Sequence, residues 1–199
     1  MEKKRTVAVF DFDGTLTTKD TFLEFIKYTH GTLALYKGIL WHTPWLILMM
    51  LHLYPRWKAK QRMFSWFYKG MTYMDFVRKG QDFTSVAQRM LRVETMKLWH
   101  EHKQRNSTIY VVSASVEEWV KPFCLQMGAE KVLGTTVEVD SEGKLTGRFL
   151  SKNCYGKEKV RRFLEVEPYR PTYYLYAYGD SKGDKEMLNF ADEGHFVHI

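Results

Sequence analysis

The chain has 199 residues, 45% of them hydrophobic, and a formal net charge of +7. This length and composition suit one domain of ordinary size, or a core domain with an insertion, and argue against a disordered chain. Its two cysteines provide neither a disulfide framework nor a Cys-rich metal site. The amino terminus leads directly into a strand-like run, so we expect a cytoplasmic protein without a signal peptide.

The positive charge lies in one region of the chain. Between Phe25 and Met74 there is no Asp or Glu, so the remaining residues sum to about zero charge. The basic residues of this region are Lys27, Lys37, Arg56, Lys58, Lys60, Arg62 and Lys69, and it also contains Trp41, Trp45, Trp57 and Trp66.

Alternating strand and helix patterns predict an α/β fold. Apolar, β-branched or aromatic runs predict strands over residues 6–10, 108–112, 132–133, 173–178 and 196–199. Helical spacing occurs over residues 72–105, 115–127, 157–166 and 182–190. We therefore expect a Rossmann-like parallel sheet covered by helices on both faces, with ligands at the carboxyl ends of the strands.

Two segments depart from this alternation. Residues 135–149 alternate apolar and polar side chains around Asp140-Ser141-Glu142-Gly143, which predicts a small β-hairpin. Residues 17–85 are helical in pattern and rich in aromatic side chains, and they separate the first strand from the second. We interpret them as an inserted helical cap on a core made of residues 1–16 and 86–199.

A pair of carboxylates ends the first predicted strand. Asp11 and Asp13 are two residues apart, so in extended geometry their side chains point the same way, and Gly14 allows a sharp turn beside them. Two like charges at one site favour a bound hard cation, Mg²⁺ above all. Taken alone, the segment could also be an ordinary strand-to-loop transition.

Three further polar elements follow later strands or begin helices. Ser113-Ala114-Ser115 precedes a helix, where backbone N–H groups favour an anion, although either serine could simply be a helix cap. Lys157 stands at a helix start, an unfavourable place for a cation unless an anion is near, and a solvated surface lysine is the ordinary alternative. Asp180 and Asp184 follow the strand at 173–178, in what could be an ordinary loop.

In this order, the segments DFDGTLT, VVSAS, GKEKV and YGDSKGD resemble the haloacid dehalogenase superfamily over nearly the whole chain. The resemblance implies that Asp11 is the nucleophile that becomes phosphorylated and that Asp13 is the general acid and base. It also implies that Lys157 neutralises the charge of the transition state. These roles describe a phosphatase that hydrolyses phosphomonoesters.

The same resemblance implies the binding residues. Ser113, Ala114, Gly14 and Thr15 would surround the phosphoryl group. The Mg²⁺ ligands would be the Asp11 and Asp180 carboxylates and the Asp13 backbone carbonyl, with Asp184 orienting metal-bound water from the outer shell.

The position of the cap resembles the phosphoserine-phosphatase-like branch. Asp20 stands where those enzymes usually have glutamate, and Gly183 stands where they have an asparagine near the phosphate. Both differences argue against phosphoserine as the substrate.

The cap also contains a strongly apolar stretch at residues 33–54, interrupted by Lys37, His42, Pro44 and His52. It is too interrupted for a membrane span, but with the basic, aromatic segment after it the stretch suits an anionic membrane surface. In composition this cap resembles the bacterial phosphatidylglycerophosphatase C group. A buried core helix or a dimer contact is the alternative interpretation.

The leading hypothesis is therefore a Mg²⁺-dependent phosphatase of a lipid-linked or bulky anionic phosphate, peripheral at the inner membrane. One alternative is a soluble phosphatase of small metabolites such as phosphoserine, sugar phosphates or nucleotide monophosphates. Another is a non-catalytic membrane or nucleic-acid binder on the same fold, although the full set of chemical residues makes a nucleic-acid partner unexpected. The sequence does not determine the oligomeric state.

Overall fold

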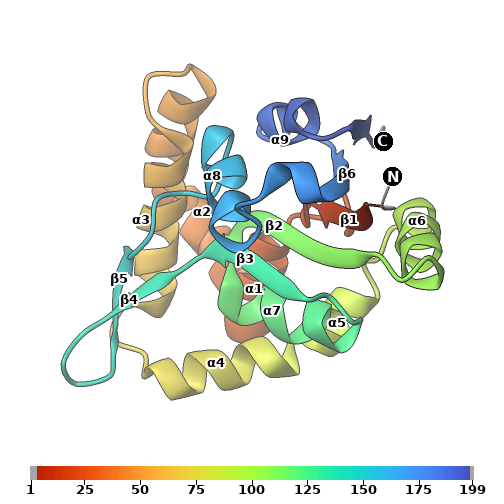
Figure 1. Ribbon diagram of the computed structural model, residues 1–199. Coiled ribbons are helices and arrows are strands. Elements are labelled where there is room, and N and C mark those ends of the chain that lie inside the picture. Colours follow the sequence, from red (N-terminus) through yellow and green to blue (C-terminus); the bar gives the residue numbers. More distant parts are fainter. Residues whose placement is uncertain (1–3, 198–199) are drawn as a thin grey trace.

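A computed structural model describes residues 4–197 (Figure 1). A five-stranded parallel sheet has the order β3-β2-β1-β6-β7, and β4 and β5 form a separate antiparallel pair. The strands are β1 (Arg5–Phe10), β2 (Thr108–Val116), β3 (Lys131–Thr135), β4 (Val137–Val139), β5 (Leu145–Phe149), β6 (Tyr173–Gly179) and β7 (Glu193–Phe196). The predicted α/β fold with a small hairpin is confirmed.

Side chains alternate across the sheet and build a core on each face. In β1, Ala8 and Phe10 belong to the larger core cluster, which includes Trp99 of α6 and Trp119 of α7. The neighbouring β1 residues Val7 and Val9 belong to the second cluster, with side chains from α8 and α9. The helices over the core are α6 (Val93–Gln104), α7 (Glu117–Gln126), α8 (Lys157–Val166) and α9 (Lys185–Phe190), and a 3₁₀ turn, η1 (Arg170–Thr172), precedes β6.

The segment between β1 and α6 is entirely helical apart from its turns. It contains α1 (Thr21–His30), α2 (Thr32–Met50), α3 (Arg56–Tyr68), α4 (Tyr73–Asp82) and α5 (Thr84–Gln88). α2 and α3 form a hairpin along one side of the molecule, and their connecting loop, in orange, projects at one end (Figure 1). α4 and α5 pack on α7, and the predicted boundary at residue 85 falls inside α5, so the division into cap and core stays a prediction.

Two predicted elements differ from the structure. The helical tract over 72–105 is three helices, with breaks at Phe83 and at residues 89–92. At the second break the chain contacts the loop that follows β1: Leu91 bridges Thr17, and the Arg92 N–H donates to the Leu16 carbonyl at 2.8 Å. The last strand lies at Glu193–Phe196 instead of 196–199, where it pairs with β6. Residues 198 and 199 lie outside the described part.

Candidate active site

The site lies at the carboxyl end of the sheet, where β1 and β6 end side by side. Asp11 follows β1 directly, and its N–H donates to the carbonyl of Tyr178 in β6 at 2.9 Å. Asp180 follows β6, and Asp184 lies just before α9. Because neighbouring parallel strands end at the same edge, the pairing of β1 with β6 brings carboxylates far apart in sequence together.

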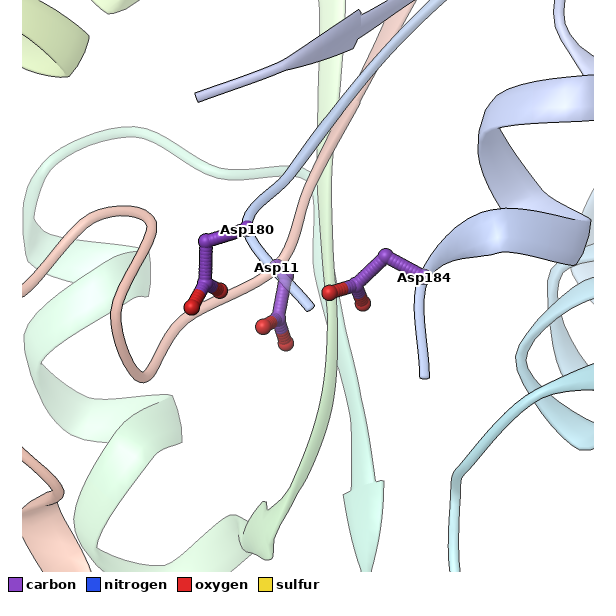
Figure 2. A group of neighbouring side chains, drawn as sticks. All are labelled: Asp11, Asp180 and Asp184. Atoms are coloured by element: carbon purple, nitrogen blue, oxygen red, sulfur yellow. The ribbon is translucent and has the colours of Figure 1, made fainter. Parts of the chain in front are cut away.

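Three carboxylates converge on one space (Figure 2). One oxygen each from Asp11, Asp180 and Asp184 lies within 4.8 Å of the others, and Asp11 and Asp184 are buried. Oxygen ligands gathered in this way fit a hard divalent cation such as Mg²⁺. The Asp13 side chain is not part of this group among the described residues, and Asp184, expected further from the metal, lies inside it.

Within residues 4–197, one buried ammonium group faces this cluster. Lys159 Nζ donates to Asp11 Oδ1 at 2.6 Å and also to the carboxylate of Asp184, and its side chain is 3% exposed. One positive charge against three carboxylates leaves an excess of negative charge. Burial raises the pKa of Asp11 to about 8, even though Lys159 opposes the shift, so a second cation would stabilise this site.

The lysine of the site is therefore Lys159, and the assignment to Lys157 is corrected. Lys157 is the first residue of α8 and is exposed, whereas Lys159 points from the same helix into the sheet end. The helical period explains the choice: Lys159 shares a face with the buried Arg162 and Phe163, three and four residues later. The spacing of Lys159, Arg162 and Phe163 is the pattern in the sequence that could have indicated Lys159.

Asp13 is held on the other side of the site by hydroxyl and amide donors. Thr21 donates to Asp13 Oδ1 from its N–H at 2.8 Å and from its hydroxyl at 2.5 Å, and the Ser115 hydroxyl donates to Asp13 Oδ2. Burial raises the pKa of Asp13, the negative charge of Asp20 adds to the shift, and the cation of Lys60 opposes it. A raised pKa suits a carboxyl group that must carry a proton.

Ser113 and Ser115 have different places in the site: Ser113 lines the pocket, and Ser115 contacts Asp13. Ser113 is buried, lines the pocket and accepts a hydrogen bond from the Ser115 N–H at 3.0 Å. Ser115 does not cap the following helix, because Val116 is the N-cap residue of α7 and makes no side-chain cap. Ala114 lines the pocket and uses its carbonyl to accept from Lys60 Nζ at 3.2 Å.

The first loop packs closely against Asp180. Thr15 Oγ1 donates to Asp180 Oδ1 at 2.9 Å, and Gly14 has φ +85°, where a Cβ atom would lie 2.2 Å from Asp180 Oδ2. Ser181 donates to Asp184 from both its N–H, at 3.0 Å, and its hydroxyl, at 2.7 Å. Thr15 thus positions the Asp180 carboxylate, and Ser181 positions the Asp184 carboxylate.

These groups border a pocket of about 480 Å³ between the sheet end and the α2–α3 hairpin. Asp11, Asp13, Ser113 and Lys159 form its polar floor. Its other wall is largely apolar and comes from the hairpin and the start of α1: Phe22, Leu23, Ile39, Leu46, Met49, Trp57, Ala59 and Met63, with Arg56 and Lys60. The sequence did not assign Thr21, Lys60 or Lys159 to the site, and it offered Ser115 only as part of an anion-binding segment or as a helix cap, because the positions of these side chains depend on packing.

Asp20 and Gly183 also border the pocket. Asp20 is the N-cap of α1, accepting from the N–H of Phe22 at 2.9 Å. A Cβ atom at Gly183 would lie 2.4 Å from the ring of Tyr155, so the ring occupies the space where a longer side chain would stand.

Residues 8–189 match the model of the haloacid dehalogenase-like hydrolase family. The chain belongs to this family, as its motifs predicted. It is 35% identical to the protein CicA of Caulobacter vibrioides over 189 residues, which cover 94% of this chain and 83% of the relative. A second relative, a probable phosphatase of Mycobacterium tuberculosis, is 35% identical over 108 residues, 53% of this chain and 37% of the relative.

Among solved structures, a probable phosphoserine phosphatase from Vibrio cholerae superposes with a TM-score of 0.69 at 18% identity, covering 98% of this chain and 56% of that one. At this identity the likeness shows the fold alone. The family match confirms the prediction of a hydrolase, and one of the relatives is named a probable phosphatase.

Proposed function

We propose that the protein is a Mg²⁺-dependent phosphomonoester hydrolase that forms an aspartyl-phosphate on Asp11. The observation that carries this proposal is the buried Lys159, which contacts both Asp11 and Asp184 beside a three-carboxylate cluster at the sheet end. Mg²⁺ bound by Asp11 and Asp180 would supply positive charge beside the phosphoryl group.

In the first step, a carboxylate oxygen of Asp11 attacks phosphorus and forms an O–P bond as the bond to the substrate's alcohol oxygen breaks. Asp13 donates its proton to the departing oxygen. In the second step Asp13 takes a proton from water, which attacks the phosphorus of the phosphorylated Asp11 and releases inorganic phosphate. Lys159 offsets the negative charge on Asp11 throughout, and the hydroxyl of Ser113 at the pocket floor would bind a phosphoryl oxygen.

The substrate we propose carries an apolar group next to its phosphate, as a lipid-linked phosphate does. Support comes from the pocket wall opposite the carboxylates, where Ile39, Leu46 and Met49 of α2 present apolar side chains. Arg56 and Lys60, at the start of α3, add positive charge at the same wall and suit an anionic headgroup.

Hydrolysis of an aryl phosphate tests the chemistry. Activity should require Mg²⁺, disappear with EDTA and be lost in Asp11→Asn, since an amide cannot serve as the nucleophile. No turnover on any phosphate would refute the proposal and favour a non-catalytic binder.

A substrate panel tests the class of phosphate. It should contain phosphatidylglycerophosphate, lysophosphatidate, phosphoserine and a sugar phosphate. Preference for the small soluble compounds would support the proposed phosphatase activity and contradict the proposed lipid-linked substrate.

A further inference from the structure

Helix α2 is apolar on both of its faces, although only one face is covered. Its inner face packs on α1 and α3, and Leu35, Gly38 and His42 are buried there. The approach is close at Gly38, where a Cβ atom would lie 2.5 Å from the ring of Phe67. A helix with apolar side chains all round is normally covered on every side.

The outer face of α2 and the loop after it expose a cluster of large apolar side chains. We call this the docking surface: Leu40, Trp41, Ile47, Met50, Leu51 and Leu53. Leu40, Met50 and Leu53 are each more than 70% exposed, at 75%, 74% and 72%. Single exposed apolar residues are common, but six large ones between residues 40 and 53, on one helix and its loop, are typical of an interaction site.

The hairpin that carries the docking surface is cationic, which favours an anionic partner. Lys37 lies one helical turn before Trp41 of the docking surface. On α3, Lys58 Nζ lies 5.5 Å from the ring of Trp57 and the Arg62 guanidinium lies 4.6 Å from the ring of Trp45, two tryptophans of the same hairpin that lie outside the docking surface. Residues 26–73 contain no Asp or Glu to offset these cations. A second copy meeting this surface with its own would bring like charges together, which disfavours a symmetric dimer.

Apolar and aromatic side chains flanked by basic residues suit the interface of an anionic bilayer. Within residues 4–197, no helix is long and apolar enough to cross a membrane. Contact through the docking surface would therefore lie in the interfacial layer.

The docking surface and the pocket share one end of the hairpin. Leu46 and Met49 line the pocket, while Ile47 and Met50, the next residues along α2, are exposed on the docking surface. The loop that joins α2 to α3 projects at that end of the molecule (Figure 1). A membrane at the docking surface would therefore lie beside the hairpin wall of the pocket.

We infer that the docking surface inserts into the interfacial layer of an anionic lipid membrane and presents the pocket to a phosphate held in that membrane. The inference that the protein inserts is argued from the exposed side chains of the docking surface alone. Only the inference that the membrane holds the substrate rests on the proposed function.

Cosedimentation with vesicles tests the insertion. The protein should pellet with phosphatidylcholine vesicles that contain phosphatidylserine and pellet much less with phosphatidylcholine alone. Leu51→Asp/Leu53→Asp should weaken the binding by about tenfold or more, because two large apolar contacts become charges of the wrong sign. The matched control is Met74→Asp/Val93→Asp, which changes two exposed apolar residues on α4 and α6 and should match the wild type apart from a small charge effect.

A second pair of variants tests the cations. Lys37→Gln/Lys58→Gln should reduce binding more than Lys97→Gln/Lys131→Gln, although each removes two exposed positive charges. In the wild type, added vesicles should also shift tryptophan emission to the blue, since Trp41 of the docking surface would leave water.

Aryl phosphate turnover, measured for every variant, separates this inference from the proposed function and reports folding. Vesicle binding without any phosphatase activity would preserve the inference and refute the proposed function. Phosphatase activity with no anionic vesicle binding, or equal binding by the Leu51→Asp/Leu53→Asp variant and its control, would overturn the inference. A wild-type dimer that this variant dissociates, with no vesicle binding, would assign the surface to a second copy instead.

Discussion

Replacing Lys159 by methionine removes the only ammonium group that contacts the Asp11 and Asp184 carboxylates among the described residues, while keeping most of the side-chain volume. Lys159 is 3% exposed and Asp184 is completely buried, so water cannot replace the lost partner. Breaking a buried ion pair by removing one partner costs about 3–5 kcal/mol. In a protein of this size a loss of that order lowers the Tm by roughly 10 °C.

The matched control is Lys157→Met, two residues earlier on α8, where the side chain is exposed. It should leave both Tm and turnover close to wild type. For Lys159→Met we expect turnover of an aryl phosphate to fall by about 10²–10³, the usual effect of losing one charge-stabilising group. Differential scanning fluorimetry and steady-state kinetics at saturating Mg²⁺ measure the two effects.

Added Mg²⁺ gives a further readout for Lys159→Met. A divalent cation at the carboxylate cluster would offset part of the missing charge, so Mg²⁺ should raise the Tm of Lys159→Met more than that of Lys157→Met. Equal Tm and turnover for the two variants, or a larger loss in Lys157→Met, would refute the assignment of Lys159 to the site.

Three further predictions concern single positions. Gly14→Ala should abolish most activity, because its Cβ would lie 2.2 Å from Asp180 Oδ2 at φ +85°; normal Mg²⁺-dependent kinetics would contradict this. Asp13→Asn should lower kcat/KM, which reports the first step alone, far more for an alkyl phosphate than for an aryl phosphate, whose leaving group needs less protonation, and equal losses of kcat/KM would exclude Asp13 as the acid. Burial raises the pKa of Glu118 to about 7, so the folded state binds the extra proton and wild-type stability should fall as pH rises from about 4.5 to 7. Asp11 and Asp13, whose pKa values are also raised, contribute their own part of this fall, so Glu118→Gln should make it smaller without abolishing it. The variant should be more stable than wild type by about 2 kcal/mol at pH 8 but not at pH 5, as urea unfolding would show, because Gln cannot ionise and can still accept from Tyr73.

The sequence by itself determined the parallel sheet and the carboxylates at its edge. β1 is a short apolar run, and the period of two places Asp11 and Asp13 just beyond its end. The strand order brings the segment after β6 beside them, as expected for residues that follow parallel strands. These features depend on local pattern and on chain order, which a single sequence contains.

Only the tertiary structure decided which side of a helix faces the sheet and which side faces solvent. Lys157 and Lys159 lie in the same helix, and packing of α8 on the sheet turned Lys159 inward and left Lys157 in solvent. Ser115 likewise became a partner of Asp13 instead of a helix cap, because β2 extends to Val116. A segment's periodicity shows that one face is buried, but the neighbours that bury it are remote in sequence.

The same limit applies to α2. Its composition predicts a helix that is apolar all round, which fits a core, a dimer contact or a lipid surface equally well. Packing on α1 and α3 covers one face of α2 and leaves Leu40 and Met50 in solvent. Which face remains open depends on what the rest of the chain folds against, so only the folded structure could separate the docking surface from the core.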